Sequence, residues 1–119
     1  MFDCSSQYKG ESINKYFLQG PDLTNKLIGV LIRFRQETVA FTTDIEAMFH
    51  QVKVTKEYQD FLRFLWWPNG ETSEETETYR MTVHLFGATS SPGCANFALK
   101  QTAVDNEEEI GISAAEFLR

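Results

Sequence analysis

The sequence has few cysteines and prolines, and it lacks a long apolar run. Its two cysteines, Cys4 and Cys94, lie far apart without Cys-x-x-Cys spacing. This spacing argues against zinc and fits a reducing compartment. No apolar run approaches the roughly 20 residues that a membrane span needs, and no basic region precedes an apolar one at the N-terminus. We therefore expect an intracellular protein of the cytoplasm or nucleus that is neither secreted nor bound to a membrane.

The sequence also lacks the excess of basic residues that is typical of nucleic-acid-binding proteins. Its 17 acidic and 11 basic residues give a net charge of −6. Two segments, residues 71–77 and 105–109, each contain four acids and no Lys or Arg. Without these eight acids, nine acids remain against eleven bases, so the rest of the chain is close to neutral. We interpret both acidic segments as solvated loops, and charge alone neither supports nor excludes nucleic-acid binding.

The length of 119 residues allows one domain with a modest core. The composition, 42% hydrophobic and 24% charged, is typical of a globular chain. The chain begins with residues 1–4, which have the pattern of an edge strand. It ends with a helical pattern over residues 114–119 that has no stop signal. We therefore interpret it as a piece of a larger protein.

The spacing of apolar residues predicts two long helices. The first spans residues 21–35 and has one apolar face. Arg33 and Arg35 fall in its last turn, where cations complement the helix dipole. We expect the helix to face the core and both arginines to be solvated, with phosphate contact as the alternative. The second helix spans about residues 92–104, with Ser91 as its N-cap.

Three further segments predict strands. Residues 37–44 are rich in β-branched and aromatic residues. The nearly continuous apolar run 61–67 predicts a strand buried on both faces, and the alternation over residues 79–85 predicts a half-buried strand. The turn signal at residues 68–70 leads us to expect the last two as an antiparallel hairpin. The predicted fold class is α+β, with antiparallel strands packed against helices.

Four rings in or near these strands carry no predicted site. His50 and His84 lack metal-ligand spacing with a cysteine, so we expect them to be structural or exposed. Trp66 and Trp67 are of a type that stacks on bases, but we expect them to pack within their strand.

The residues around Asp44 are suited to bind a cation together with a phosphate. Asp44 stands at the end of a predicted strand, and residues 46–50 favour a short turn or helix. Carboxylate oxygens bind Mg²⁺, and free amides at the start of a helical turn bind anions. Phe49 follows five residues after the acid. The alternatives are a helix cap or turn acid for Asp44 and core packing for Phe49.

Ordered motifs extend this pattern over nearly the whole chain. They comprise residues 2–6 with 18–25, residues 44–52 with 61–67, and residues 84–92. Together they resemble reverse transcriptases, most closely the polymerase of Bel-Pao type LTR retrotransposons. The resemblance implies that residues 1–119 form a partial right-hand polymerase fold of fingers and palm.

The same resemblance implies an activity, a cofactor and partners. The parent enzyme is an RNA-directed DNA polymerase that transfers nucleotides to a primer 3′-OH. It uses two Mg²⁺ ions, an RNA or DNA template–primer and deoxynucleoside triphosphates, and it belongs to a longer polyprotein.

The resemblance also implies roles for five residues of the first motif. Asp44 is the catalytic carboxylate, and it binds metal together with the carbonyl of Ile45. The amides of Ala47 and Met48 hold the triphosphate. Phe49 packs under the sugar and leaves no room for a 2′-OH, which selects deoxynucleotides.

The second motif is the loop that begins at Phe86 and Gly87, and it is implied to contact nucleotide and template. Retroviral enzymes carry Gln in place of Phe86. Phenylalanine cannot donate the same hydrogen bond, although it can stack or pack.

The sequence contains no Asp-Asp pair, and the resemblance places that metal-binding turn just after Arg119. A two-metal site needs carboxylates from separate strands, so we expect the chain alone to be inactive. One alternative is a non-catalytic remnant or a co-opted binding module. Another is an unrelated small α/β binding domain.

Overall fold

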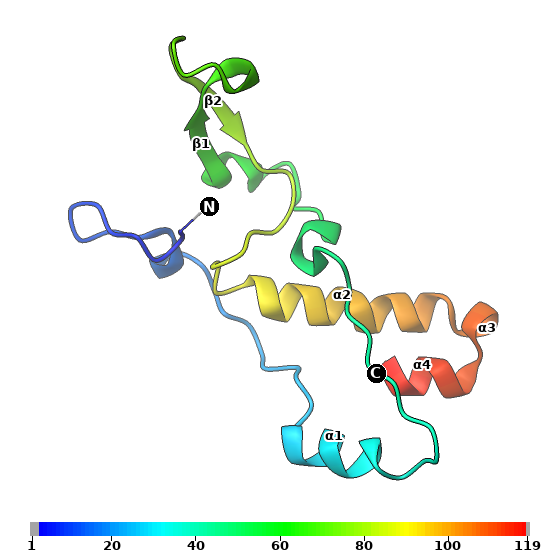
Figure 1. Ribbon diagram of the computed structural model, residues 1–119. Coiled ribbons are helices and arrows are strands. Elements are labelled where there is room, and N and C mark those ends of the chain that lie inside the picture. The colour runs from blue at the N-terminus through cyan, green and yellow to red at the C-terminus, as the bar shows by residue number, and fades with distance from the viewer. Residues whose placement is uncertain (1–2, 119) are drawn as a thin grey trace.

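The computed structural model describes residues 3–118, and this part of the chain has α+β architecture, as predicted (Figure 1). It contains one antiparallel sheet of two strands and four α-helices. The elements are β1 (Arg63–Trp66), β2 (Glu77–Arg80), α1 (Leu27–Phe34), α2 (Ser91–Asp105), α3 (Glu107–Ile110) and α4 (Ile112–Leu118). Short 3-10 helices span Ile13–Lys15, Met48–Gln51, Gln59–Leu62 and Pro68–Gly70.

The predicted antiparallel hairpin is confirmed. Phe64 pairs with Tyr79 in the ladder, and their rings stack with centroids 5.9 Å apart. The prediction that β1 is buried on both faces is wrong, because Leu65 is 64% exposed and Trp66 is 52% exposed. Burial on both faces requires a layer on each side of the sheet. Here the apolar run is half of a two-stranded ribbon at one end of the molecule (Figure 1).

The strand predicted over residues 37–44 does not form. The segment is irregular, with Val39 80% exposed and Phe41 82% exposed. β-branched and aromatic residues favour a strand where neighbouring strands offer pairing and packing. Among the described residues, the sheet consists of β1 and β2 alone. Residues 37–44 therefore have no neighbouring strand to pair with, and their β-propensity alone does not form a strand.

The strand predicted at residues 1–4 lies partly outside the described residues, and its described part forms a turn instead. The Oδ1 atom of Asp3 accepts hydrogen bonds from the Ser5 amide at 2.9 Å and the Ser5 hydroxyl at 2.6 Å. These bonds lower the pKa of Asp3. Local bonds of this kind compete with extended backbone.

The helix predicted over residues 21–35 is shorter than expected, because α1 begins at Leu27. Asp22 accepts hydrogen bonds from the amide and the hydroxyl of Thr24, and these bonds lower its pKa. The resulting turn occupies the residues predicted to start the helix. Arg33 lies in the last turn of α1, as predicted, but the prediction that this helix faces the core is wrong, because none of its residues is buried.

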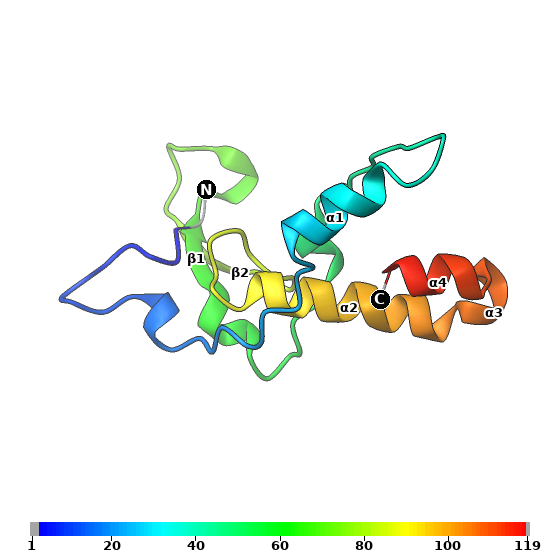
Figure 2. The ribbon, with the colours of Figure 1, turned by 90° about the horizontal axis from the view of Figure 1, so that it is seen from below.

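The second long helix is confirmed as α2, although its N-cap is Ser90 instead of Ser91. The prediction of a loop over residues 105–109 is wrong, because α3 begins at Glu107. Acids in the first turn of a helix complement the helix dipole. The run of acids was interpreted as a loop because the charge pattern alone does not distinguish a solvated loop from such a first turn. Helices α2, α3 and α4 pack side by side (Figures 1 and 2). Residues 71–76 form an exposed loop, as predicted for most of the other acidic segment.

The buried core is small. In the described residues it consists of a cluster of Cys4, Leu62, Leu85 and Ala88, and Ala95, Ala103 and Ala115 are buried as well. The molecule is elongated, with extents of 58 × 31 × 26 Å and a radius of gyration of 18.6 Å. A compact chain of this length has a radius of gyration of about 14 Å. The few buried residues therefore carry much of the tertiary packing.

Two further properties follow from the described residues. Cys4 and Cys94 are free thiols, and burial raises the pKa of Cys4. Among the described helices, each is too short or too polar to cross a membrane.

Candidate functional site

The chain reverses direction shortly after Asp44. Ala47 adopts a left-handed conformation with φ of 50°. Its carbonyl accepts hydrogen bonds from the amides of His50 at 2.7 Å and Gln51 at 3.3 Å. These bonds close the 3-10 helix Met48–Gln51, which lies within the region predicted to be a short turn or helix. Met48 and Phe49 are half-buried on this helix.

The segment after this helix runs antiparallel to the residues that precede Phe86. The His84 amide donates to the Val52 carbonyl at 2.9 Å, and the Val54 amide donates to the Thr82 carbonyl at 2.9 Å. These two bonds flank an isolated antiparallel bridge between Lys53 and Val83. The pairing fixes the two predicted motifs next to each other.

Two of the predicted nucleotide-binding residues meet beside this pairing. The rings of Phe49 and Phe86 lie with centroids 4.8 Å apart and planes at 67°, which is a favourable edge-to-face arrangement. The His50 ring lies 6.3 Å from the Phe86 ring. Phe86 nevertheless remains 60% exposed, so it presents a ring surface to solvent.

A side chain from the N-terminal part of the chain holds the loop that contains Gly87. Asn14 donates from Nδ2 to the Gly87 carbonyl at 2.9 Å and accepts from the Thr89 amide at 3.0 Å. Gly87 has a φ of 83°, a conformation that favours glycine. The Asn14 amide donates to the Cys4 carbonyl at 3.1 Å, which ties the same residue to the core.

Asp44 lies in the irregular segment and is exposed. Its Oδ1 atom accepts a hydrogen bond from the Ile45 amide at 2.9 Å. The Asp44 carboxylate and the Ile45 carbonyl are oxygen donors of the type that Mg²⁺ prefers. They fit the metal in type but not in number, because the described residues contain no group of three His, Cys, Asp or Glu placed to hold a metal. No nucleotidyl-transfer step follows from these residues alone.

The amides assigned to the triphosphate are available as donors. Within residues 3–118, no hydrogen bond is recorded from the main-chain amides of Ala47 and Met48. Amides without an intramolecular partner at the start of a helical turn are the groups that bind anions. The predicted site therefore offers two amide donors, the rings of Phe49 and Phe86, and the single carboxylate of Asp44.

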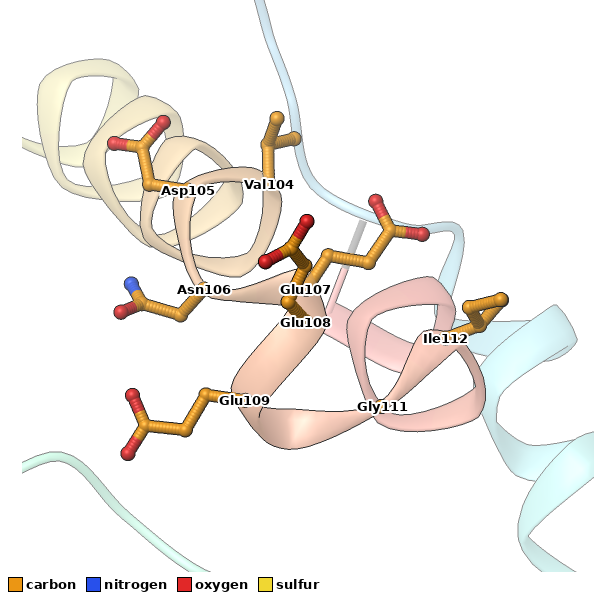
Figure 3. Close-up of a pocket in the computed structure, with 8 residues that line it drawn as sticks. All are labelled: Val104, Asp105, Asn106, Glu107, Glu108, Glu109, Gly111 and Ile112. Carbon is orange, nitrogen blue, oxygen red and sulfur yellow. The ribbon is translucent and has the colours of Figure 1, made fainter.

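A hollow of about 1030 Å³ lies elsewhere and is acidic. It is lined by residues 104–109 with Gly111 and Ile112. Figure 3 shows the carboxylates of Asp105 and Glu109 pointing in different directions. Among the described residues, the carboxylates that line this hollow do not form a group placed to hold a metal ion.

Comparison with known proteins adds no family to this description. No protein-family model, curated protein or solved structure matches the chain. The structure itself shows a small α+β domain.

His84, expected to be structural or exposed, is half-buried, and it lines two cavities of about 610 Å³ each. Burial lowers its pKa below the ordinary value of 6.5. The unfolded chain therefore takes up a proton at this residue at a higher pH than the folded chain does. It follows that acidification through the unfolded pKa favours unfolding.

We expect the free energy of unfolding to fall between about pH 7.5 and about pH 5.5, with His84 causing part of the loss. Urea unfolding of the wild type and His84→Gln at both pH values measures that part. The Gln variant is expected to lose less stability on acidification. An equal loss in both proteins would contradict the role of His84, and His50→Gln is the matched control.

Proposed function

We propose that the chain is a segment of an RNA-directed DNA polymerase of the Bel-Pao reverse transcriptase type. It forms part of the fingers and the first portion of the palm of a right-hand polymerase fold. The parent enzyme acts inside the cell on a template–primer and deoxynucleoside triphosphates, with Mg²⁺ as cofactor. This chain contributes one metal-binding carboxylate and part of the nucleotide-binding surface.

The contact between Phe49 and Phe86 is the observation that carries the proposal. The two residues come from separate motifs, and their rings lie 4.8 Å apart. The antiparallel bonds between residues 52–54 and 82–84 hold the same two motifs together. A polymerase needs both motifs at one nucleotide.

The resemblance to reverse transcriptases gives each residue of the proposed site a role. The amides of Ala47 and Met48 donate to phosphate oxygens. Phe49 packs beneath the sugar, and the contact with the Phe86 ring limits the movement of the Phe49 ring. Gly87 allows the loop to turn close to the nucleotide, because glycine adopts its positive φ without strain.

The chain alone is proposed to be inactive as a polymerase. Asp44 is a single exposed carboxylate, whereas in-line phosphoryl transfer with two ions needs several bridging oxygens. Mg²⁺-dependent extension of a primer by the purified chain, lost in Asp44→Ala, would contradict this statement.

The second candidate is a non-catalytic remnant or a co-opted binding module. The exposed apolar side chains of the elongated molecule favour it, since such surfaces often mark partners. It predicts that Asp44 and the motif amides have no special affinity for a nucleotide with its metal.

A titration with Mg²⁺ and dTTP, followed by two-dimensional NMR, separates the two candidates. The polymerase proposal predicts amide shifts concentrated at residues 45–49 and 86–87. These shifts are expected to be lost in Asp44→Asn and retained in the neighbouring control Glu46→Gln. Shifts confined to the acidic segments 71–77 and 105–109, or unchanged by Asp44→Asn, would contradict the proposal.

A further inference from the structure

A cleft of about 460 Å³ lies between α1 and α2, away from the motifs described above. One wall is formed by Val30, Arg33 and Phe34 of α1. These positions are spaced i, i+3 and i+4, so they share one helix face. The cleft is therefore lined by a continuous stripe of the helix, with a cation between two apolar side chains.

The opposite wall has the same arrangement. Asn96, Leu99 and Lys100 of α2 line the cleft, again at i, i+3 and i+4. Residues 23–25 close the remaining side, and they include the amide side chain of Asn25. The two facing stripes and residues 23–25 together bring a guanidinium, an ammonium and two amides to one cleft.

The charge of this region has the opposite sign to that of the whole chain. Residues 23–36 and 91–104 contain four cations and no acid, although the net charge of the chain is −6. No ion pair is recorded for Arg33 or Lys100 in the described part of the chain. The acids that directly flank these ranges are Asp22, Glu37 and Asp105, and none of them lines the cleft. The Asp22 carboxylate accepts hydrogen bonds from Thr24, and the Asp105 carboxylate accepts one from Gln101.

The cleft also offers a surface for a planar or apolar group. Val30 and Phe34 are each 45% exposed, and both line the cleft together with Leu99. An exposed phenylalanine is a stacking platform for a base. Guanidinium and ammonium groups bind phosphate oxygens through charge-assisted hydrogen bonds.

We propose that the cleft between α1 and α2 binds a phosphate ester that carries an aromatic or apolar group, with Arg33 and Lys100 as its anion-binding side chains. A free nucleotide and a nucleotide of a single strand share this chemistry. The proposal does not rest on the polymerase function, because it involves neither Asp44 nor the Phe49–Phe86 pair.

Isothermal titration of the full chain with AMP, adenosine and single-stranded oligodeoxythymidylate tests the proposal. We expect AMP to bind more tightly than adenosine. Arg33→Gln and Lys100→Gln are each expected to weaken AMP binding at least about fivefold. The exposed, remote Lys56→Gln is the matched control and is expected to bind like the wild type.

The charge-retaining variants Arg33→Lys and Lys100→Arg keep the proposal testable if a Gln variant folds poorly. Both are expected to retain most of the affinity for AMP. Tighter, salt-sensitive binding of the oligonucleotide would identify a strand as the source of the phosphate, and equal or tighter binding of AMP would identify a free nucleotide. Absence of binding by both phosphate probes, equal binding of adenosine, or AMP binding unchanged in both Gln variants would overturn the proposal.

Discussion

Replacement of Leu85 by alanine is expected to destabilise the protein by about 2–5 kcal/mol, the range for a buried leucine cut back to its Cβ. Leu85 is 2% exposed and packs with Cys4, Leu62 and Ala88. These residues come from different parts of the chain, so a cavity at Leu85 removes contacts from each of them. The total stability of a small domain is about 5–15 kcal/mol, and this substitution therefore removes a large share of it.

Urea unfolding followed by circular dichroism measures the effect. The matched control is Leu65→Ala, because Leu65 is 64% exposed. This control is expected to change the free energy of unfolding by less than about 0.5 kcal/mol, as surface substitutions usually do. Equal effects of the two substitutions would show that Leu85 does not lie in the core.

Replacement of Asn14 by alanine is expected to cost about 1–2 kcal/mol, because it removes two hydrogen bonds to the loop at residues 86–89. Asn14 both donates to the Gly87 carbonyl and accepts from the Thr89 amide. The loop groups are exposed, so water replaces part of what is lost. The loop itself is expected to loosen more than the rest of the molecule.

Hydrogen exchange at the Thr89 amide reports on the loop directly. Exchange at this amide is expected to accelerate in Asn14→Ala more than exchange in α2. The matched control Gln7→Ala lies in the same N-terminal loop and is exposed, and it is expected to leave the Thr89 amide unchanged. Unchanged exchange in Asn14→Ala would rule out the bridge between the N-terminal loop and the second motif.

Local sequence signals predicted the elements that depend on local chemistry. The turn residues at 68–70 predicted the antiparallel hairpin, and Pro92 predicted the start of α2 within a residue or two. The alternation over residues 79–85 predicted a half-buried second strand, but β2 spans Glu77–Arg80 and is exposed. The strand over residues 37–44 failed because its formation depends on a partner strand, and propensity carries no information about partners.

In the candidate site, too, local features were predicted and contacts between distant segments were not. The short helical turn after Asp44 was predicted from local residue types. The contact between Phe49 and Phe86 depends on pairing between segments far apart in sequence, which spacing alone does not reveal. Asn14 was missed for this reason, because an asparagine in a polar loop gives no signal of a bond to Gly87. The facing stripes that contain Arg33 and Lys100 likewise become visible only when α1 and α2 are placed together.

The most direct test of the account is a titration with Mn²⁺, whose unpaired electrons broaden the NMR signals of nearby amides. Asp44 and its neighbours are proposed as a partial metal site in the same motif as Phe49, whose ring contacts Phe86. The account predicts broadening at residues 44–49 and 86–87 that Asp44→Asn abolishes and Glu46→Gln retains. Broadening in the acidic segments 71–77 and 105–109 is expected in all three proteins. Broadening confined to those segments, with no dependence on Asp44, would contradict the account.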